Sequence, residues 1–212
     1  MNEQEFFHFI DRSIAFQAEV GGNVSRLAPV PEVRFMVAFQ SGLIALEHST
    51  AVLQLIRSGL FASSFSLFRP QFESLVRGIW LLYAATDTAV ENLAQPLSVE
   101  SVSKANDVPM LTRMLDKLEK SEAPTAIVAQ LQQYKEATWK SMNSYAHGGI
   151  HPMARTLRGY PAQRTYEAMR NSNAVTALTA QLMAILSGDP DNMVPVRTLH
   201  NDFIDCLPIA VS

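Results

Sequence analysis

Apolar residues recur every three to four positions along most of the chain, which is the spacing of amphipathic α-helices. The pattern predicts helices over residues 6–18, 32–57, 65–83, 124–147, 162–186 and 194–207. No segment shows the alternation of β-branched and polar residues that marks a strand. We therefore expect an all-α fold: a single-domain helical bundle over residues 1–212, in which long antiparallel helices carry shorter peripheral ones.

Glycine and proline mark the expected ends of these helices. The glycine pairs at 21–22 and 148–149 are each expected to stop a helix. Residues 150–161 contain one glycine and two prolines, which is typical of a turn-rich connection. The more polar residues 87–122 are expected to form short helices at the periphery of the bundle.

The helix over residues 65–83 is apolar nearly all round, yet it carries Arg69, Glu73 and Arg77 at four-residue intervals on one face. Such a helix belongs in the middle of a bundle. A buried charge without a partner costs on the order of several kcal/mol, so we expect all three charges to be paired. Pro70 predicts either a kink or a helix that restarts with the proline in its first turn.

Composition limits the class of protein. Apolar residues make up 48% of the 212 residues, and the formal net charge of -3 argues against a surface coated in positive charge. The single cysteine, Cys206, cannot form an intrachain disulfide and is typical of a small packed residue. The N-terminus lacks the pattern of a signal peptide, and the longest apolar run is far shorter than the roughly 20 residues of a membrane span. We expect a cytoplasmic protein without membrane association.

Charge is unevenly distributed, because residues 137–188 contain five basic residues and one acidic residue and so carry +4. The basic residues are Lys140, Arg155, Arg158, Arg164 and Arg170. His147 lies among them at the predicted end of a core helix, where the helix dipole favours a positively charged imidazole. Arginine binds phosphate and histidine transfers protons near neutral pH, so the segment suits a phosphate-bearing ligand. The alternative is that these arginines pair with carboxylates across helix interfaces.

The histidines do not predict a metal site. His147 and His151 have the spacing of ligands on one helix face, but the two glycines between them break the helix and no carboxylate or cysteine lies nearby. Zinc needs three or four converging protein ligands, so we expect no metal, and no motif indicates a cofactor. His48 beside Glu47 is typical of a residue hydrogen-bonded to a neighbour at the edge of a core.

The charged face of residues 69–77 has two interpretations. In the structural one, Arg69, Glu73 and Arg77 form an intrahelical ion-pair chain that also binds a neighbouring helix or a dimer partner. In the functional one, Glu73 orients His147 while Arg69 or Arg77 receives an anion, so that a base held by a carboxylate faces a cation.

An Arg-x-x-x-Glu at residues 69–73 and a Ser-x-x-His-Gly at residues 144–148 resemble motifs of uncharacterised bacterial helical families. Such families resemble, more remotely, the HEPN superfamily of helical bundles, many of which are dimeric, metal-independent RNases of toxin–antitoxin and antiphage systems. Their hallmark is an arginine followed a few residues later by a histidine near a helix end. His147 matches this histidine, while Lys140, followed by Ser141, stands at the position of the arginine.

The resemblance implies a HEPN-like metal-independent RNase, acting on RNA as a homodimer, of a toxin–antitoxin or antiphage type. The residues implied are His147 as acid/base catalyst, Lys140 and Arg155 as phosphate contacts, and Arg69, Glu73, Arg77 and Ser144 as supporting residues. The alternative is a non-catalytic helical module for dimerisation or for binding a cognate protein or a small anionic ligand. A buried, fully hydrogen-bonded His147 with Lys140 directed away would favour that module.

Overall fold

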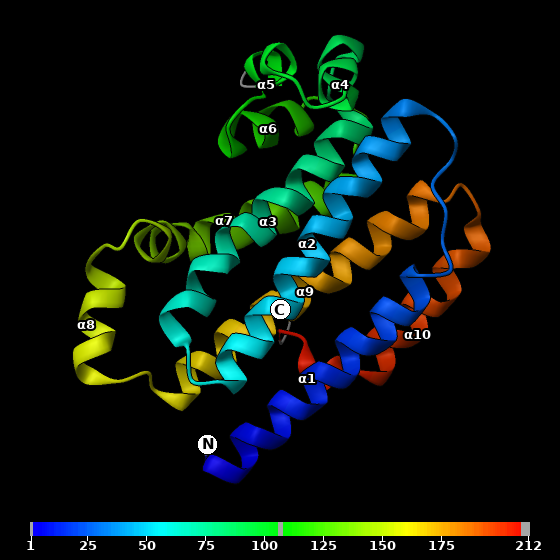
Figure 1. The fold of residues 1–212 in the computed structure, drawn as a ribbon. Helices are drawn as coiled ribbons and strands as arrows, with labels where there is room; N and C mark the ends of the chain where they lie inside the picture. The colour runs from blue at the N-terminus through cyan, green and yellow to red at the C-terminus, as the bar shows by residue number, and fades with distance from the viewer. Residues whose placement is uncertain (1, 106–107, 209–212) are drawn as a thin grey trace.

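The computed structural model describes residues 2–105 and 108–208, and these form ten α-helices and two short 3₁₀ segments, with no strand among them (Figure 1). The α-helices are α1 (Glu3–Val24), α2 (Val33–Arg57), α3 (Phe61–Tyr83), α4 (Asp87–Ala94), α5 (Val99–Ala105), α6 (Leu111–Leu118), α7 (Thr125–Ala146), α8 (Ile150–Arg158), α9 (Ala162–Leu186) and α10 (Met193–Asp202). The 3₁₀ segments are η1 (Pro190–Asn192) and η2 (Ile204–Cys206). The predicted all-α fold is confirmed.

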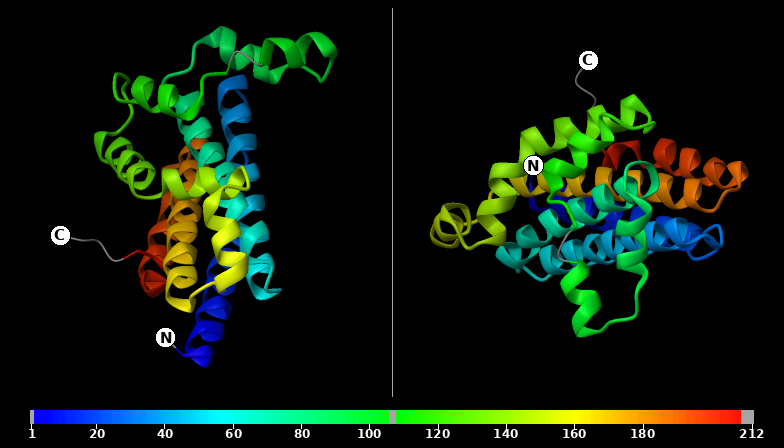
Figure 2. Two further views of the ribbon diagram at one scale, coloured as in Figure 1. Left: turned by 90° about the vertical axis from the view of Figure 1, so that its left-hand side faces the viewer. Right: turned by 90° about the horizontal axis from the view of Figure 1, so that it is seen from above.

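The centre of the bundle is an antiparallel hairpin of α2 and α3, joined by a turn in which Gly59 has a positive φ of 75°. Figures 1 and 2 show α9 alongside this hairpin and α7 crossing α3. Helix α1 packs against both α2 and α9, and α10 packs against α9 and α1. The helices α4, α5 and α6 lie together beyond the end at which α2 begins and α3 ends. None of the helices described is long and apolar enough to cross a membrane.

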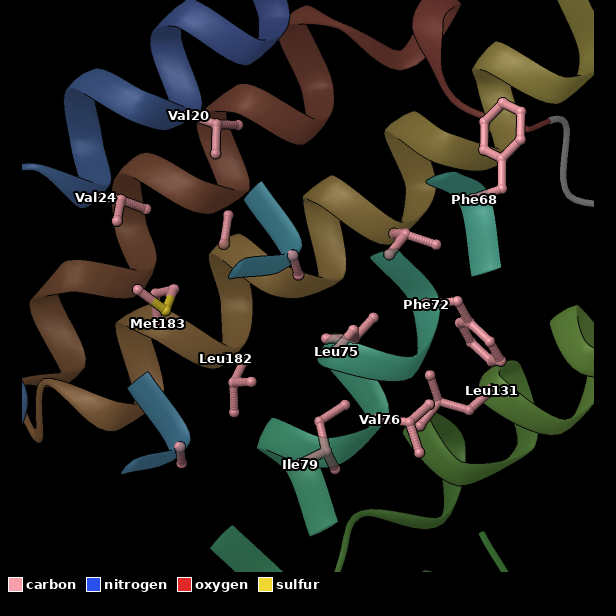
Figure 3. Close-up of a cluster of buried hydrophobic side chains, with 14 of the residues drawn as sticks. Val20, Val24, Phe68, Phe72, Leu75, Val76, Ile79, Leu131, Leu182 and Met183 are labelled. Carbon is pink, nitrogen blue, oxygen red and sulfur yellow. The ribbon is translucent and has the colours of Figure 1, made fainter. Parts of the chain in front are cut away.

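Helix α3 occupies the middle of the core, as its composition predicts. Phe72, Leu75 and Val76 are completely buried, and Figure 3 shows them between Leu131 of α7 and Leu182 of α9. Complete burial of a large apolar side chain stabilises a fold by about 1.5–3 kcal/mol. The apolar part of α3 thus fixes where its charged face lies.

Three predicted boundaries are wrong. Helix α1 continues through the glycine pair at 21–22 to Val24. A glycine inside a helix costs only about 1 kcal/mol, and the burial of Val20 and Val24 offsets that cost. The expected connection at 150–161 contains α8, and the helix expected over 194–207 ends at Asp202 and is followed by η2.

The other boundary predictions have mixed outcomes. Helix α3 contains Pro70 as an interior residue, so the interpretation in which the helix restarts at the proline is wrong. The short helices predicted for residues 87–122 are present as α4, α5 and α6. Residues 106–107, inside that range, lie outside the described part of the chain.

Gly78 allows α3 to approach its neighbours closely. A Cβ atom at Gly78 would lie 2.7 Å from Leu182 Cδ2 and 3.3 Å from the carbonyl oxygen of Ala38, whereas one at Gly21 would meet nothing within 4 Å. The close contact at Gly78 therefore depends on the absence of a side chain.

We expect Gly78→Ala to lower the free energy of unfolding by about 1–3 kcal/mol, because the added methyl group overpacks the α2–α3–α9 contact. Gly21→Ala, also in a helix, should raise it by about 0.5–1 kcal/mol, because alanine favours the helix and has room. Urea denaturation of both variants measures the difference. Equal changes in the two variants would contradict the packing described for α3.

Candidate functional site

Helix α7 ends in a tight glycine turn that exposes His147. His147 is the C-cap residue, and Gly148 follows it with a positive φ of 64°, a conformation that favours glycine. The N–H of Gly149 donates to the carbonyl of Ser144 at 2.7 Å, and that of Gly148 donates to the carbonyl of Tyr145 at 3.4 Å. These two bonds are the usual way in which a left-handed glycine closes a helix.

Ser144 fastens the next helix to the end of α7. Its Oγ accepts a hydrogen bond of 3.1 Å from the backbone N–H of His151, in the first turn of α8. The N-cap residue of α8 is Gly149, which has no side chain for this purpose, and a Cβ there would lie 2.7 Å from Ser144 Oγ. The capping oxygen thus comes from α7, which explains why the local sequence predicts a turn where α8 forms.

The exposed imidazole of His147 meets the charged face of α3. Arg69 Nη1 lies 2.6 Å from His147 Nε2, and Arg69 Nε donates to Glu73 Oε1 at 2.9 Å. The guanidinium carbon of Arg69 lies 5.1 Å from the ring centroid of Trp139, within cation–π range. We call Arg69, Glu73, Trp139 and His147 the corner site.

The contact with Arg69 bears on the tautomer of the imidazole. A guanidinium group has only donors, so a hydrogen bond at this contact requires Nε2 of His147 to accept it and the ring proton to lie on Nδ1. The helix dipole, by contrast, favours a positive charge on this imidazole. The dipole at an exposed helix end contributes only about 0.3–1 kcal/mol, and a guanidinium in direct contact opposes it. His147 thus lies beside a cation that the ion pair with Glu73 holds in place.

The structure separates the other predicted site residues from this contact. Arg77 is half-buried and makes no hydrogen bond or ion pair with the described residues, so the expected pairing of all three charges is wrong for Arg77. Lys140 is exposed on α7 and likewise has no such partner in the part of the chain described. Arg155 lines a cleft elsewhere. The cation in contact with His147 is therefore Arg69 and not Lys140.

Trp139 of the corner site, and Asn143 on the same side of α7, escape prediction from motifs. Trp139 and Asn143 precede His147 by eight and four residues and so share its side of α7. The Oδ1 atom of Asn143 is buried and has no hydrogen-bond partner in the described part of the chain. The four-residue spacing back from His147 is the signal that could have identified both.

A cleft of about 280 Å³ lies on the other side of α7, between α3, α8 and α9. Helix α7 contributes Tyr134, Thr138, Ser141 and Tyr145, which follow one face, while none of the corner-site residues lines the cleft. The remaining polar residues that line it include His151, Arg155, Tyr160, Arg164 and Glu167. The basic segment of the sequence is thus divided between two faces of α7.

Other candidate groups are less suited to chemistry. Cys206 is completely buried, and burial raises the pKa of its thiol to about 11, so it is protonated at neutral pH. His48 is half-buried on α2. Within residues 2–105 and 108–208, no three histidine, cysteine or carboxylate side chains are grouped closely enough to hold a metal ion.

The chain belongs to the family of unknown function DUF6988, whose family model matches residues 42–209. The matched range includes α3, α7 and α8, and with them both the corner site and the cleft. Comparison with curated proteins and with solved structures finds no match.

We expect Ser144→Ala to lower the free energy of unfolding by about 1 kcal/mol, because α8 loses the oxygen that caps its first turn. The substitution should speed up amide hydrogen exchange in α8 more than in α7. Ser63→Ala, at an exposed position of α3, is the control and should change stability by less than about 0.5 kcal/mol. If the two variants behave alike, Ser144 does not hold α8 in place.

Proposed function

We propose that this member of the DUF6988 family is a HEPN-like, metal-independent ribonuclease whose reactive centre is the corner site. The observation that carries the proposal is the 2.6 Å contact between Arg69 Nη1 and His147 Nε2 at an exposed helix end. Metal-independent RNA cleavage needs a proton acceptor near neutral pH and a cation beside the phosphate. A neutral imidazole and a guanidinium supply both.

The proposed reaction begins when a phosphate of RNA takes the Nη1 donor of Arg69 and frees Nε2 of His147. Nε2 then accepts the proton of the 2′-hydroxyl as that oxygen attacks the adjacent phosphorus. The bond from phosphorus to the 5′-oxygen breaks, and the imidazolium returns the proton to that oxygen. The products are a 2′,3′-cyclic phosphate and a 5′-hydroxyl, and no metal takes part.

Glu73 and Trp139 position the cation in this scheme. The side chains of Arg69 and Glu73 are only 19% and 27% exposed, so their ion pair is partly shielded from water and holds the guanidinium in one orientation. Trp139 covers the guanidinium from α7. Lys140 lies two helical turns before His147, where it can contact the phosphate of a neighbouring nucleotide.

A homodimer remains part of the proposal, as the HEPN resemblance implies. Directly after His147, α8 exposes three apolar side chains at helical spacing: Ile150 (75% exposed), Met153 (67%) and Leu157 (89%). A second copy packed on this stripe would lie beside the corner site. A cytoplasmic role in toxin–antitoxin or antiphage defence follows from the same resemblance.

The alternative function is a non-catalytic module that binds a cognate protein or a small anionic ligand. The observation in its favour is that Arg69 already occupies His147 Nε2, which closes a polar network between α3 and α7. Against it, His147 is exposed, and its Nδ1 has no partner among the residues described. An accessible base favours the catalytic interpretation.

We expect the full chain to cleave a mixed RNA pool in EDTA and to leave 2′,3′-cyclic phosphate ends. His147→Ala should lower the rate by at least about 100-fold, because general base catalysis is lost. Arg69→Gln should lower it by a similar factor, because charge on the phosphate is no longer stabilised. His8→Ala, at an exposed histidine of α1, is the matched control and should cleave like the wild type.

Circular dichroism of each purified variant must show the same helical content. Equal cleavage by all four proteins would reveal a contaminating nuclease and contradict the proposal. An absence of cleavage by the folded wild type would also contradict it and would favour the binding module.

A further inference from the structure

We propose that the cleft between α3, α7, α8 and α9 binds a small ligand made of a single aromatic ring that carries an anionic group. The site goes beyond the ribonuclease proposal, because Arg69, Glu73 and His147 do not line the cleft. In Figure 1, α8 lies at the edge of the bundle, between the end of α7 and the start of α9.

The cleft has aromatic walls. The ring centroid of Phe65 lies 4.9 Å from that of Tyr145, 5.6 Å from that of Tyr160 and 5.2 Å from that of Phe68, and all four residues line the cleft. These separations are in the range of favourable aromatic pairs. A planar ring that entered the cleft would meet aromatic surfaces from α3, α7 and the segment between α8 and α9.

Two cations face the same space without a partner. Arg155 and Arg164 line the cleft, and neither side chain makes a hydrogen bond or ion pair with the described residues. Burial raises the pKa of Tyr145, and both guanidinium groups partly oppose that shift, so both charges lie near this hydroxyl. The only carboxylate among the lining residues, Glu167, accepts a hydrogen bond of 3.1 Å from Gln163. The balance of charge in the cleft favours an anion.

A buried hydroxyl in the cleft makes no hydrogen bond of ordinary geometry within the described residues. It is the Oη atom of Tyr160. Burial raises the pKa of Tyr160, and the hydroxyls of Tyr145 and Thr156 lie near enough to oppose that shift. Buried polar groups in folded proteins are nearly always hydrogen-bonded, so an unsatisfied one marks a place for a further acceptor or donor. An anionic group bound by Arg155 or Arg164 would bring acceptor oxygens near the hydroxyl of Tyr160.

The volume of the cleft limits the size of the ligand that can bind there. Sites for drug-sized ligands measure about 300–1,000 Å³, and the cleft of about 280 Å³ lies just below that range. One ring with one anionic group fits these dimensions. A carboxylate and a phosphate monoester both offer anionic oxygens that accept hydrogen bonds from arginine. Benzoate and phenyl phosphate represent these two kinds of anionic group.

The test is calorimetric titration of the full chain with benzoate, with phenyl phosphate and with neutral benzyl alcohol. At least one anion should bind at least about tenfold more tightly than the alcohol, because a charge-assisted hydrogen bond is lost without the anion. The anion that binds more tightly shows whether the cleft prefers a carboxylate or a phosphate. If the alcohol binds as tightly as either anion, or if no probe binds, the proposal is wrong.

Variants locate the site. Arg155→Gln and Arg164→Gln should each weaken binding of the tighter anion by about tenfold or more. Arg158→Gln is the matched control, since Arg158 is exposed on the same helix as Arg155 and does not line the cleft. An equal loss in the control would place the anion outside the cleft. His147→Ala should bind the anion like the wild type, because His147 does not line the cleft. A failure of the ligand proposal can therefore be told apart from a failure of the ribonuclease proposal.

Discussion

The guanidinium group of Arg69 is the interaction on which the functional region depends. It contacts a carboxylate on its own helix, an indole on α7 and the imidazole at the end of α7. Each contact satisfies a charge that α3 would otherwise bring into the bundle without a partner. A hydrogen bond between Arg69 and His147 requires the tautomer of His147 with its proton on Nδ1, because a guanidinium cannot accept a hydrogen bond.

The apolar faces of α3 and the turn after α7 make this contact possible. Phe72 and Leu75 are completely buried and hold α3 in place, so Arg69 has little freedom to move away from α7. On the side of His147, Gly148 ends α7 in a left-handed turn, and Ser144 accepts a hydrogen bond from the start of α8. The corner site and the cleft therefore share α7 as a common wall and use opposite faces of it.

The sequence predicts much of this arrangement, because helices that pack on a core carry a periodic apolar pattern. The central position of α3, the Arg69–Glu73 pair and the position of His147 at a helix end all follow from spacing alone. The partner of His147 does not, because Arg69 and His147 are 78 residues apart and only tertiary packing brings them together. Helix α8 escapes prediction for a similar reason, since its capping group lies on α7. Arg77 makes no ion pair within the described residues, which the spacing on α3 alone does not predict.

The most direct test of the central claim is the tautomer of His147, read from the ¹⁵N chemical shifts of its ring nitrogens. The wild-type protein should show a neutral ring at pH 8 with the proton on Nδ1 and with Nε2 accepting a hydrogen bond. In Arg69→Gln the ring should lose this fixed tautomer and exchange between the two forms. A wild-type ring protonated on Nε2, or a spectrum unchanged by the substitution, would contradict the contact on which the account depends.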